Sequence, residues 1–289
     1  MARSGARTLL PLLAALLALS GCAGAPAGDG DPTGDSDTEE TQAEAAPPSS
    51  LVGLWRVSVE GVDADAWLQI GSSTSPGSLT YLGECGAVHG SWRAQSGAWL
   101  ADSYGASGTC KEADEVGWLE RTAGYAAREG GMALLDADGN EVAALAVDGE
   151  PPANPELSDE YRQPPELTDD ELAALDAEPA PLPDGMAAPS AEDVVGRWLP
   201  LESYSTDPFL ELAADGTWTG SDGCNGQSGR WVLGAEGGLL ATAGVQTLIG
   251  CEGRSLGSSL ASAARWGLDG DRLTFYDVAG EVIDEARRA

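Results

Sequence analysis

The cysteine spacing of this 289-residue chain occurs twice, and this repetition constrains the fold more than any other feature. In each copy a cysteine is followed by a glycine after five residues, a tryptophan after seven and a second cysteine after 25 or 27. The two sets are Cys85, Gly90, Trp92 and Cys110, and Cys224, Gly229, Trp231 and Cys251. The match extends upstream, where residues 51–55 (LVGLW) correspond to 194–198 (VVGRW). Since 289 residues have room for two ordinary domains, the repetition predicts two copies of one domain.

The four repeated cysteines predict two disulfide bonds, Cys85–Cys110 and Cys224–Cys251. An even set of cysteines in an exported chain is typical of a disulfide framework. Closing loops of this length stabilises a domain by about 3–4 kcal/mol on the chain-entropy estimate. The four thiols could instead bind one zinc ion, but the chain has no C-x-x-C spacing and each pair recurs within its own repeat. Disulfides are therefore favoured over a metal site.

The first 21 residues have the pattern of a targeting segment. Two arginines precede an apolar run of eleven residues at 9–19, too short to span a bilayer comfortably. The following Leu19-Ser20-Gly21-Cys22 resembles the lipobox of bacterial lipoproteins. The resemblance implies cleavage between Gly21 and Cys22, a diacylglycerol on the Cys22 sulfur and stable attachment to the cell membrane. The alternative is an ordinary signal peptide followed by a chance cysteine.

The charge of the chain argues against nucleic acid as a partner. Its 47 acidic and 15 basic residues give a formal net charge of −32, whereas phosphate binding needs clustered lysine and arginine. Two segments are especially acidic and poor in aromatic residues, so they are predicted to be a disordered tether and a proline-rich linker that lets the domains move. The predicted parts are a signal peptide at 1–21, a tether at 22–50, a first domain at 51–150, a linker at 151–193 and a second domain at 194–289.

Short apolar runs separated by glycine-rich turns predict an α+β fold that is mainly antiparallel β. Strands of the first domain are expected at 53–59, 66–70, 78–82, 90–94, 98–102, 133–136 and 141–146. Those of the second are expected at 196–203, 209–213, 217–220, 229–233, 239–242, 273–278 and 281–285. Helices are expected at 112–126 and 256–264, and a capping-box pattern predicts a third at 168–176 in the linker.

The second repeat resembles the META domain, the HslJ-type module of bacterial envelope proteins. The matching segments are GRW at 196–198, LEL at 210–212, GCN at 223–225, GRW at 229–231, TLIGC at 247–251 and RLTFYD at 272–277. The first repeat is a diverged copy, with Glu84-Cys85-Gly86 in place of the GCN tripeptide. The resemblance implies two small barrel-like antiparallel sheets, each with one short helix. The family is associated with heat response, novobiocin resistance, and secretion or motility, and it supplies no catalytic residues to transfer.

The residue inventory gives little support to catalysis. His89 is the only histidine, it is expected in a turn, and the motifs of serine hydrolases and zinc proteases are missing. No metal and no cofactor is expected. Nine tryptophans stand against two phenylalanines. Most are expected in the core, but Trp99, Trp218 and Trp266 are less constrained by the repeat and could mark a binding surface.

The sequence therefore favours a non-enzymatic, lipid-anchored protein outside the cytoplasm that binds an envelope protein or a small ligand. Two alternatives remain open. One is an inhibitor or immunity-type module that caps an extracellular enzyme. The other is a hydrolase that uses a pair of carboxylates, since 47 acids will place some pairs close together by chance.

Overall fold

The computed structural model describes residues 46–60, 62–71, 77–154, 157–250 and 252–289. The predicted signal peptide, the cleavage and lipidation site at Gly21 and Cys22, and Cys251 lie outside these residues. Both repeats belong to one compact unit, Glu44–Ala289. None of the helices in the described ranges has the length and apolar character needed to cross a membrane.

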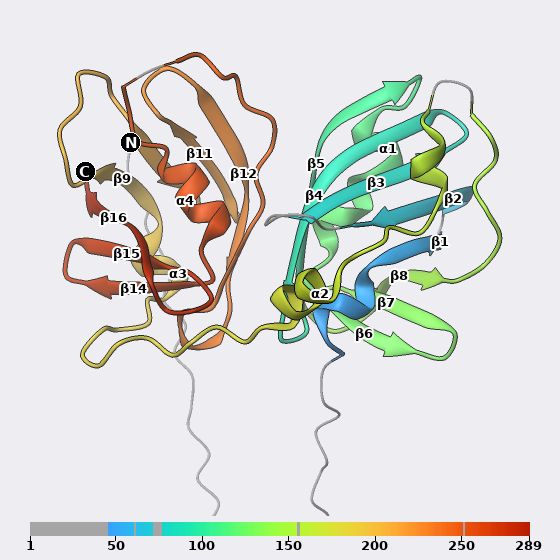
Figure 1. Ribbon diagram of the computed structural model, residues 1–289, viewed down its shortest axis with the longest axis horizontal. Helices are drawn as coiled ribbons and strands as arrows, with labels where there is room; N and C mark the ends of the chain where they lie inside the picture. Colours follow the sequence, from blue (N-terminus) through green and yellow to red (C-terminus); the bar gives the residue numbers. More distant parts are fainter. Residues whose placement is uncertain (1–45, 61, 72–76, 155–156, 251) are drawn as a thin grey trace, which may run out of the picture. The chain divides into compact units, whose positions relative to one another are not determined.

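The first repeat is a closed barrel of eight antiparallel strands in sequence order (Figure 1). The strands are β1 (Gly53–Val59), β2 (Val62–Ile70), β3 (Gly77–Gly83), β4 (Gly86–Gln95), β5 (Ala98–Gly108), β6 (Gly124–Arg128), β7 (Gly131–Leu135) and β8 (Glu141–Ala146). Closure is made by β1 and β8, where Arg56 pairs with Ala146 and Val59 with Ala143. A closed barrel leaves no unpaired sheet edge.

The helix expected at 112–126 is shorter than predicted. It consists of α1 (Glu112–Val116) and a 3₁₀ helix, η2 (Gly117–Arg121), after which β6 begins. The turn ends at Thr122, whose hydroxyl donates to the Leu119 carbonyl at 2.6 Å. Gly124 then pairs with Ala98 on one side and Leu135 on the other, and this pairing completes the barrel. Closure of the sheet thus overrides the helical spacing of the sequence.

The second repeat is an eight-stranded antiparallel sheet in the order β13-β12-β11-β10-β9-β16-β15-β14. The strands are β9 (Gly196–Pro200), β10 (Phe209–Leu212), β11 (Thr217–Ser221), β12 (Gly226–Leu233), β13 (Leu239–Ala241), β14 (Arg265–Asp269), β15 (Arg272–Tyr276) and β16 (Val282–Arg288). Its two ends approach through a bridge between Gly238 and Arg265. The strand β14 was not expected from the sequence.

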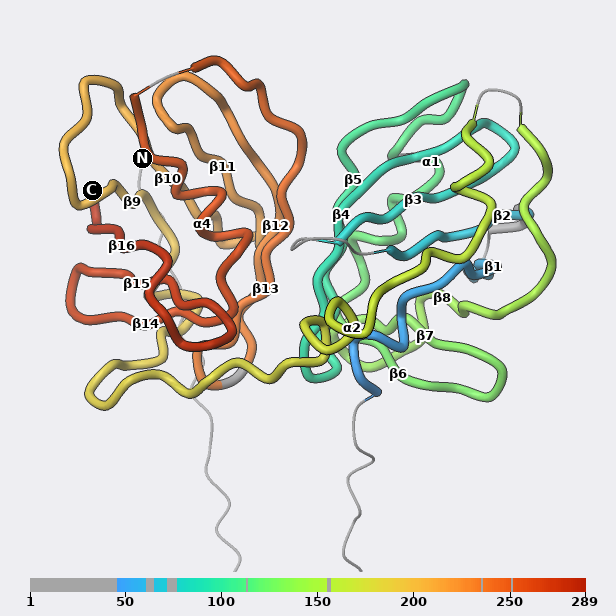
Figure 2. Tube along the Cα trace, viewed as in Figure 1, coloured from blue at the N-terminus to red at the C-terminus, as the bar shows by residue number. Residues whose placement is uncertain are grey.

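One helix of the second repeat, α4 (Leu256–Ser262), lies within the curve of this sheet (Figure 2). Its N-cap is Ser255, whose side chain accepts a hydrogen bond from the Ser258 amide. Leu256 and Leu260 are fully buried in the core that the sheet encloses. A single-turn helix, α3 (Ala191–Val194), precedes β9. The expected mainly antiparallel, barrel-like fold with few short helices is therefore confirmed.

Each repeat begins with the same tryptophan contact. The indole N–H of Trp55 donates to the Leu51 carbonyl, and that of Trp198 donates to the Val194 carbonyl, both at 2.7 Å. The repeated glycines also share one cause. A Cβ atom on Gly90 would lie 2.3 Å from the Asp102 carbonyl oxygen on β5, and one on Gly229 would lie 2.2 Å from the Thr242 carbonyl oxygen just after β13. Only glycine permits this approach of the backbones.

The predicted proline-rich linker, residues 151–193, contacts both repeats. It forms η3 (Asp159–Arg162) and α2 (Asp169–Asp176), and the predicted capping box at Thr168 is present. Gln69 of the first repeat donates to the carbonyls of Glu160 and Gln163, while the Ala180 amide donates to Val278 of the second. The last residues of the expected tether are also ordered, in η1 (Pro48–Leu51).

Two arginines connect the repeats by donating to backbone carbonyls of the opposite repeat. Arg93 on β4 donates to Ala261 at 2.7 Å and to Ala263 at 3.2 Å. Arg230 on β12 donates to Ala101 at 3.0 Å and to Glu120 at 3.1 Å. Since β4 and β12 are equivalent strands, the two repeats meet through corresponding parts of their sheets.

Candidate functional site

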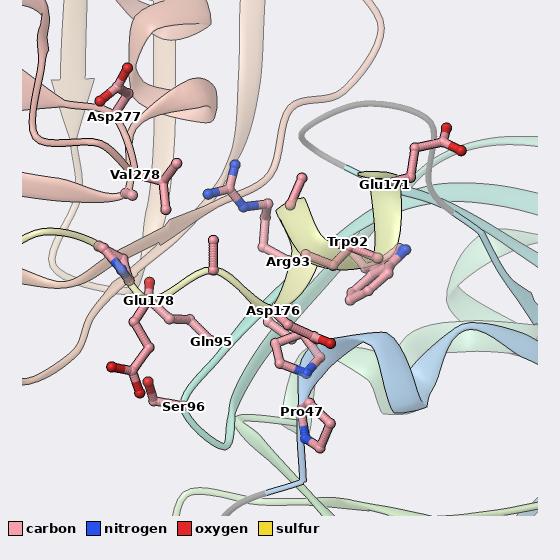
Figure 3. A pocket seen from close by; sticks show the side chains of 18 of the residues that line it. Pro47, Trp92, Arg93, Gln95, Ser96, Glu171, Asp176, Glu178, Asp277 and Val278 are labelled. Atoms are coloured by element: carbon pink, nitrogen blue, oxygen red, sulfur yellow. The ribbon is translucent and has the colours of Figure 1, made fainter. Parts of the chain in front are cut away.

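A cleft of about 870 Å³ is lined by the first repeat, the linker and the second repeat (Figure 3). The lining segments are 46–48, 77, 92–96, 171, 174–179, 262, 264 and 277–278. Its volume falls within the range of small-molecule sites, which is about 300–1,000 Å³. The cleft is therefore the candidate functional site.

The first wall is the end of β4. The Trp92 indole donates to the Gly71 carbonyl at 2.7 Å, and its ring stacks on Trp99 with centroids 5.3 Å apart. Trp92 is only 1% exposed, so it supports the wall from behind and offers no ring face to a ligand. Gly77 passes so close to this indole that a Cβ atom would lie 2.5 Å from its nitrogen.

The second wall is the helix α2, which is held at both ends. At its start, the Glu171 carboxylate accepts hydrogen bonds from the Thr168 amide and hydroxyl, and these bonds lower the pKa of Glu171. At its end, the Asp176 carboxylate accepts from the Ser49 amide at 2.8 Å and from the Ser49 hydroxyl at 2.6 Å. The helix therefore presents Ala174 and Leu175 to the cleft from a fixed position.

The third wall comes from the second repeat. Ser262 and Ala264 follow α4, and Asp277 and Val278 belong to the turn between β15 and β16. The Asp277 carboxylate accepts from the Glu281 amide at 2.9 Å, which fixes this turn. The linker bond from Ala180 to the Val278 carbonyl joins the second and third walls.

The charged groups of the cleft are mostly acidic. Its lining contains the four carboxylates of Glu171, Asp176, Glu178 and Asp277 and one cation, Arg93. Loss of contact with water lowers the pKa of Arg93 to about 10, so its guanidinium stays protonated at neutral pH. The lining is therefore net negative even with Arg93 counted.

The cleft lining includes none of the predicted disulfide cysteines, nor His89, nor the three tryptophans that were expected to mark a binding surface. Cys85 and Cys110 form a disulfide bond with their Cα atoms 4.8 Å apart, in the first repeat. The Cys224–Cys251 pairing stays a prediction, because Cys251 lies outside the described residues. His89 was expected in a turn but lies on β4, with its ring 5.6 Å from that of Tyr161.

The interpretation of three tryptophans as a binding surface is wrong. Trp99 and Trp266 are fully buried and Trp218 is 1% exposed. Trp99 stacks on Trp92, and Trp266 stacks on Trp231 with centroids 5.7 Å apart. Their large apolar rings fill the interiors of the two sheets, which is the usual role of tryptophan in a small core.

The GCN tripeptide has a structural role. Asn225 is 4% exposed, and its amide nitrogen donates to the Asp222 carboxylate and the Ile249 carbonyl. Its amide oxygen accepts from the Thr247 hydroxyl at 2.7 Å and the Ile249 amide at 2.8 Å. This side chain joins the β11–β12 turn to the segment before Cys251, and it does not contribute to the cleft.

The comparisons with known proteins agree with the fold of the second repeat. The family model described as META domain matches residues 190–289, which confirms the resemblance for that repeat and does not extend to the first. Searches of curated proteins and of solved structures found no match. Within the described ranges, histidine, cysteine and acidic side chains form no group of three or more that could hold a metal ion.

Proposed function

We propose that this protein is a lipid-anchored binding protein outside the cytoplasm whose cleft takes a small ligand. The observation that carries the proposal is the cleft itself, whose three walls come from separate parts of the chain. Each wall is held by hydrogen bonds that do not depend on a ligand. Such preorganisation lowers the entropic cost of binding.

The lining residues favour binding over catalysis. The cleft is lined by alanine, proline, leucine and valine together with four carboxylates, and its lining includes no histidine or cysteine. Three of the carboxylates, those of Glu171, Asp176 and Asp277, accept hydrogen bonds that fix the local backbone. We expect no turnover by these groups, because each is committed to holding its own wall.

The lipobox supports the location. Acylation of Cys22 would attach the chain to the membrane, with the acidic segment that follows it between the anchor and η1. Mass spectrometry of protein made in a host that processes lipoproteins tests this directly. An N-terminal peptide that begins at an acylated Cys22 supports the anchor, and an unmodified N-terminus or a retained signal peptide contradicts it.

Two neighbouring alanines on α2 provide the test of the cleft. Ala173 and Ala174 are both exposed, but only Ala174 lines the cleft. Ala174→Trp fills the cleft, whereas Ala173→Trp adds the same ring to the same helix outside it. A ligand found by thermal-shift screening should lose its effect with Ala174→Trp alone. Equal effects of the two variants would place the site elsewhere.

A second candidate function, capping an extracellular enzyme, is favoured by one exposed apolar segment. Val245, Leu248 and Ile249 are 70%, 88% and 61% exposed, on a segment that Asn225 holds in place. Leu248→Asp should abolish inhibition of a purified target enzyme. Val147→Asp, at an exposed valine of the first repeat, should leave it intact.

A further inference from the structure

We propose that the ligand of the cleft is an organic cation, a protonated amine carried on an apolar body. This inference rests on the proposed function and names the chemical class that the cleft would select. It follows from the juxtaposition of apolar walls, four carboxylates and a single arginine whose guanidinium is bonded to the backbone of the second repeat.

The apolar part of the lining would receive the body of the ligand. Pro47 and Pro48 come from the start of the described chain, Leu175 and Pro179 from the linker, and Val278 from the second repeat. Val278 is 39% exposed, so it presents an apolar surface that a ligand can cover. Removal of such apolar surface from water favours binding.

The carboxylates retain the capacity to bind a cation. A carboxylate can accept about four hydrogen bonds. Asp176 accepts two from Ser49, and Glu178 has no hydrogen-bond partner among the described residues. All the donors bonded to Glu171, Asp176 and Asp277 are neutral, so the negative charge of each carboxylate persists. Figure 3 shows Glu178 and Asp277 on one side of the cleft and Glu171 on the other.

Arg93 is poorly placed to bind an anion. Both of its terminal nitrogens donate to carbonyls of the second repeat, at Ala261 and Ala263. These contacts use one donor of each terminal nitrogen and hold the guanidinium against the second repeat, so an anion would compete with them for a bidentate bond. An anionic ligand would therefore meet four like charges and one arginine that is already bonded to the second repeat, whereas a cation would meet complementary charge.

Three probes with one apolar body and different charges test the inference on the full chain. They are 4-phenylbutylamine, which is protonated at pH 7, 4-phenylbutanol and 4-phenylbutyrate, titrated by isothermal calorimetry at low salt. We expect the amine to bind about fivefold or more tighter than the alcohol, and the acid to bind weakest. Added salt should reduce the preference for the amine, because ions screen the partly exposed carboxylates.

Matched variants locate the binding. Glu178→Gln should weaken the amine about two- to fivefold and leave the alcohol unchanged, and Glu129→Gln, at an exposed acid outside the cleft, should change neither. Ala174→Trp should abolish binding of every probe. If the alcohol or the acid binds as tightly as the amine, the cation preference is overturned while the binding function stands. If no probe binds, or Ala174→Trp has no effect, both proposals are overturned.

Discussion

The two repeats solve one structural problem in different ways. In each repeat, one strand follows the first cysteine and another segment leads to the second cysteine, and these two must be held together. In the first repeat, β4 and β5 pair down to Gly86 and Gly108, with one register shift between His89 and Gly90. In the second, the β12–β13 pairing ends at Trp231 and Ala241, and backbone bonds continue as far as Ser228 and Gly244. Beyond them, the Asn225 side chain bonds to Thr247 and Ile249.

The residue after the first cysteine accounts for the difference. Gly86 occupies this position in the first repeat, with φ of +134° and no room for a Cβ atom against the Ser107 carbonyl. Asn225 occupies it in the second and satisfies both its donor and acceptor groups. In the first repeat backbone pairing holds the segments that flank the two cysteines together. In the second repeat the buried side-chain amide of Asn225 does so.

The largest expected effect is removal of the first disulfide. Replacing Cys85 and Cys110 with serine reopens a loop with a sequence separation of 25, which should lower the stability of the first repeat by about 3.5 kcal/mol. Hydrogen exchange read by mass spectrometry should show faster exchange in peptides of 53–146 and little change in 196–288. Equal loss of protection in both repeats would show that they unfold as one unit.

The next effect is removal of the Asn225 side chain. Asn225→Ala leaves the Ile249 amide and carbonyl without their partner and should cost about 2–3 kcal/mol in the second repeat. Asn140→Ala is the control, because Asn140 is exposed and its side chain bonds only within the β7–β8 turn. Urea unfolding should separate the two variants clearly. If the two variants lose the same free energy of unfolding, the Asn225 side chain does not replace backbone pairing in the second repeat.

The contact between the repeats should contribute less. Arg93→Met and Arg230→Met each remove two hydrogen bonds to carbonyls and should cost about 1–2 kcal/mol. Because each arginine bonds to the opposite repeat, either variant should increase exchange in both repeats. Exchange confined to the mutated repeat would mean that the bonds do not couple them.

The effect that is smallest at neutral pH concerns two tyrosines of the first repeat, and it emerges only at alkaline pH. Burial raises the pKa of Tyr81 and of Tyr125 to about 12, with the charge of Glu115 adding to the effect at Tyr81. The unfolded chain loses these protons near pH 10. Their contribution to stability is therefore complete below pH 10 and falls as the pH rises to 12. Tyr81→Phe and Tyr125→Phe should each reduce the fall in the free energy of unfolding between pH 10 and pH 12. An unchanged fall in both variants would contradict this assignment.

Local features of the fold could be predicted from the sequence. The capping box at Thr168 appears where expected, because its hydrogen bonds join residues only three positions apart. The strand β6 was mistaken for the end of a helix, since only its partners β5 and β7 determine its conformation. Likewise β14 depends on β15 for its identity as a strand.

The sequence did not predict the candidate site. Its walls combine residues from 46–48, 92–96, 174–179 and 277–278, none of which forms a motif on its own. The tryptophans suggested a surface because composition does not reveal burial, and the structure places Trp99, Trp218 and Trp266 inside. The one useful signal was the capping box. It predicts that α2 begins at this point of the chain, but it does not predict that α2 lines a cleft.

The indole-to-carbonyl bonds of Trp55 and Trp198 bear on the order of folding. Each joins residues four positions apart, so it can form at small entropic cost in a chain that is still largely unfolded. The pairings β1–β8 and β9–β16 join the first and last strands of each repeat and must wait for the rest of the sheet. Each repeat thus carries a tryptophan contact that can organise its first strand long before the last strand arrives beside it.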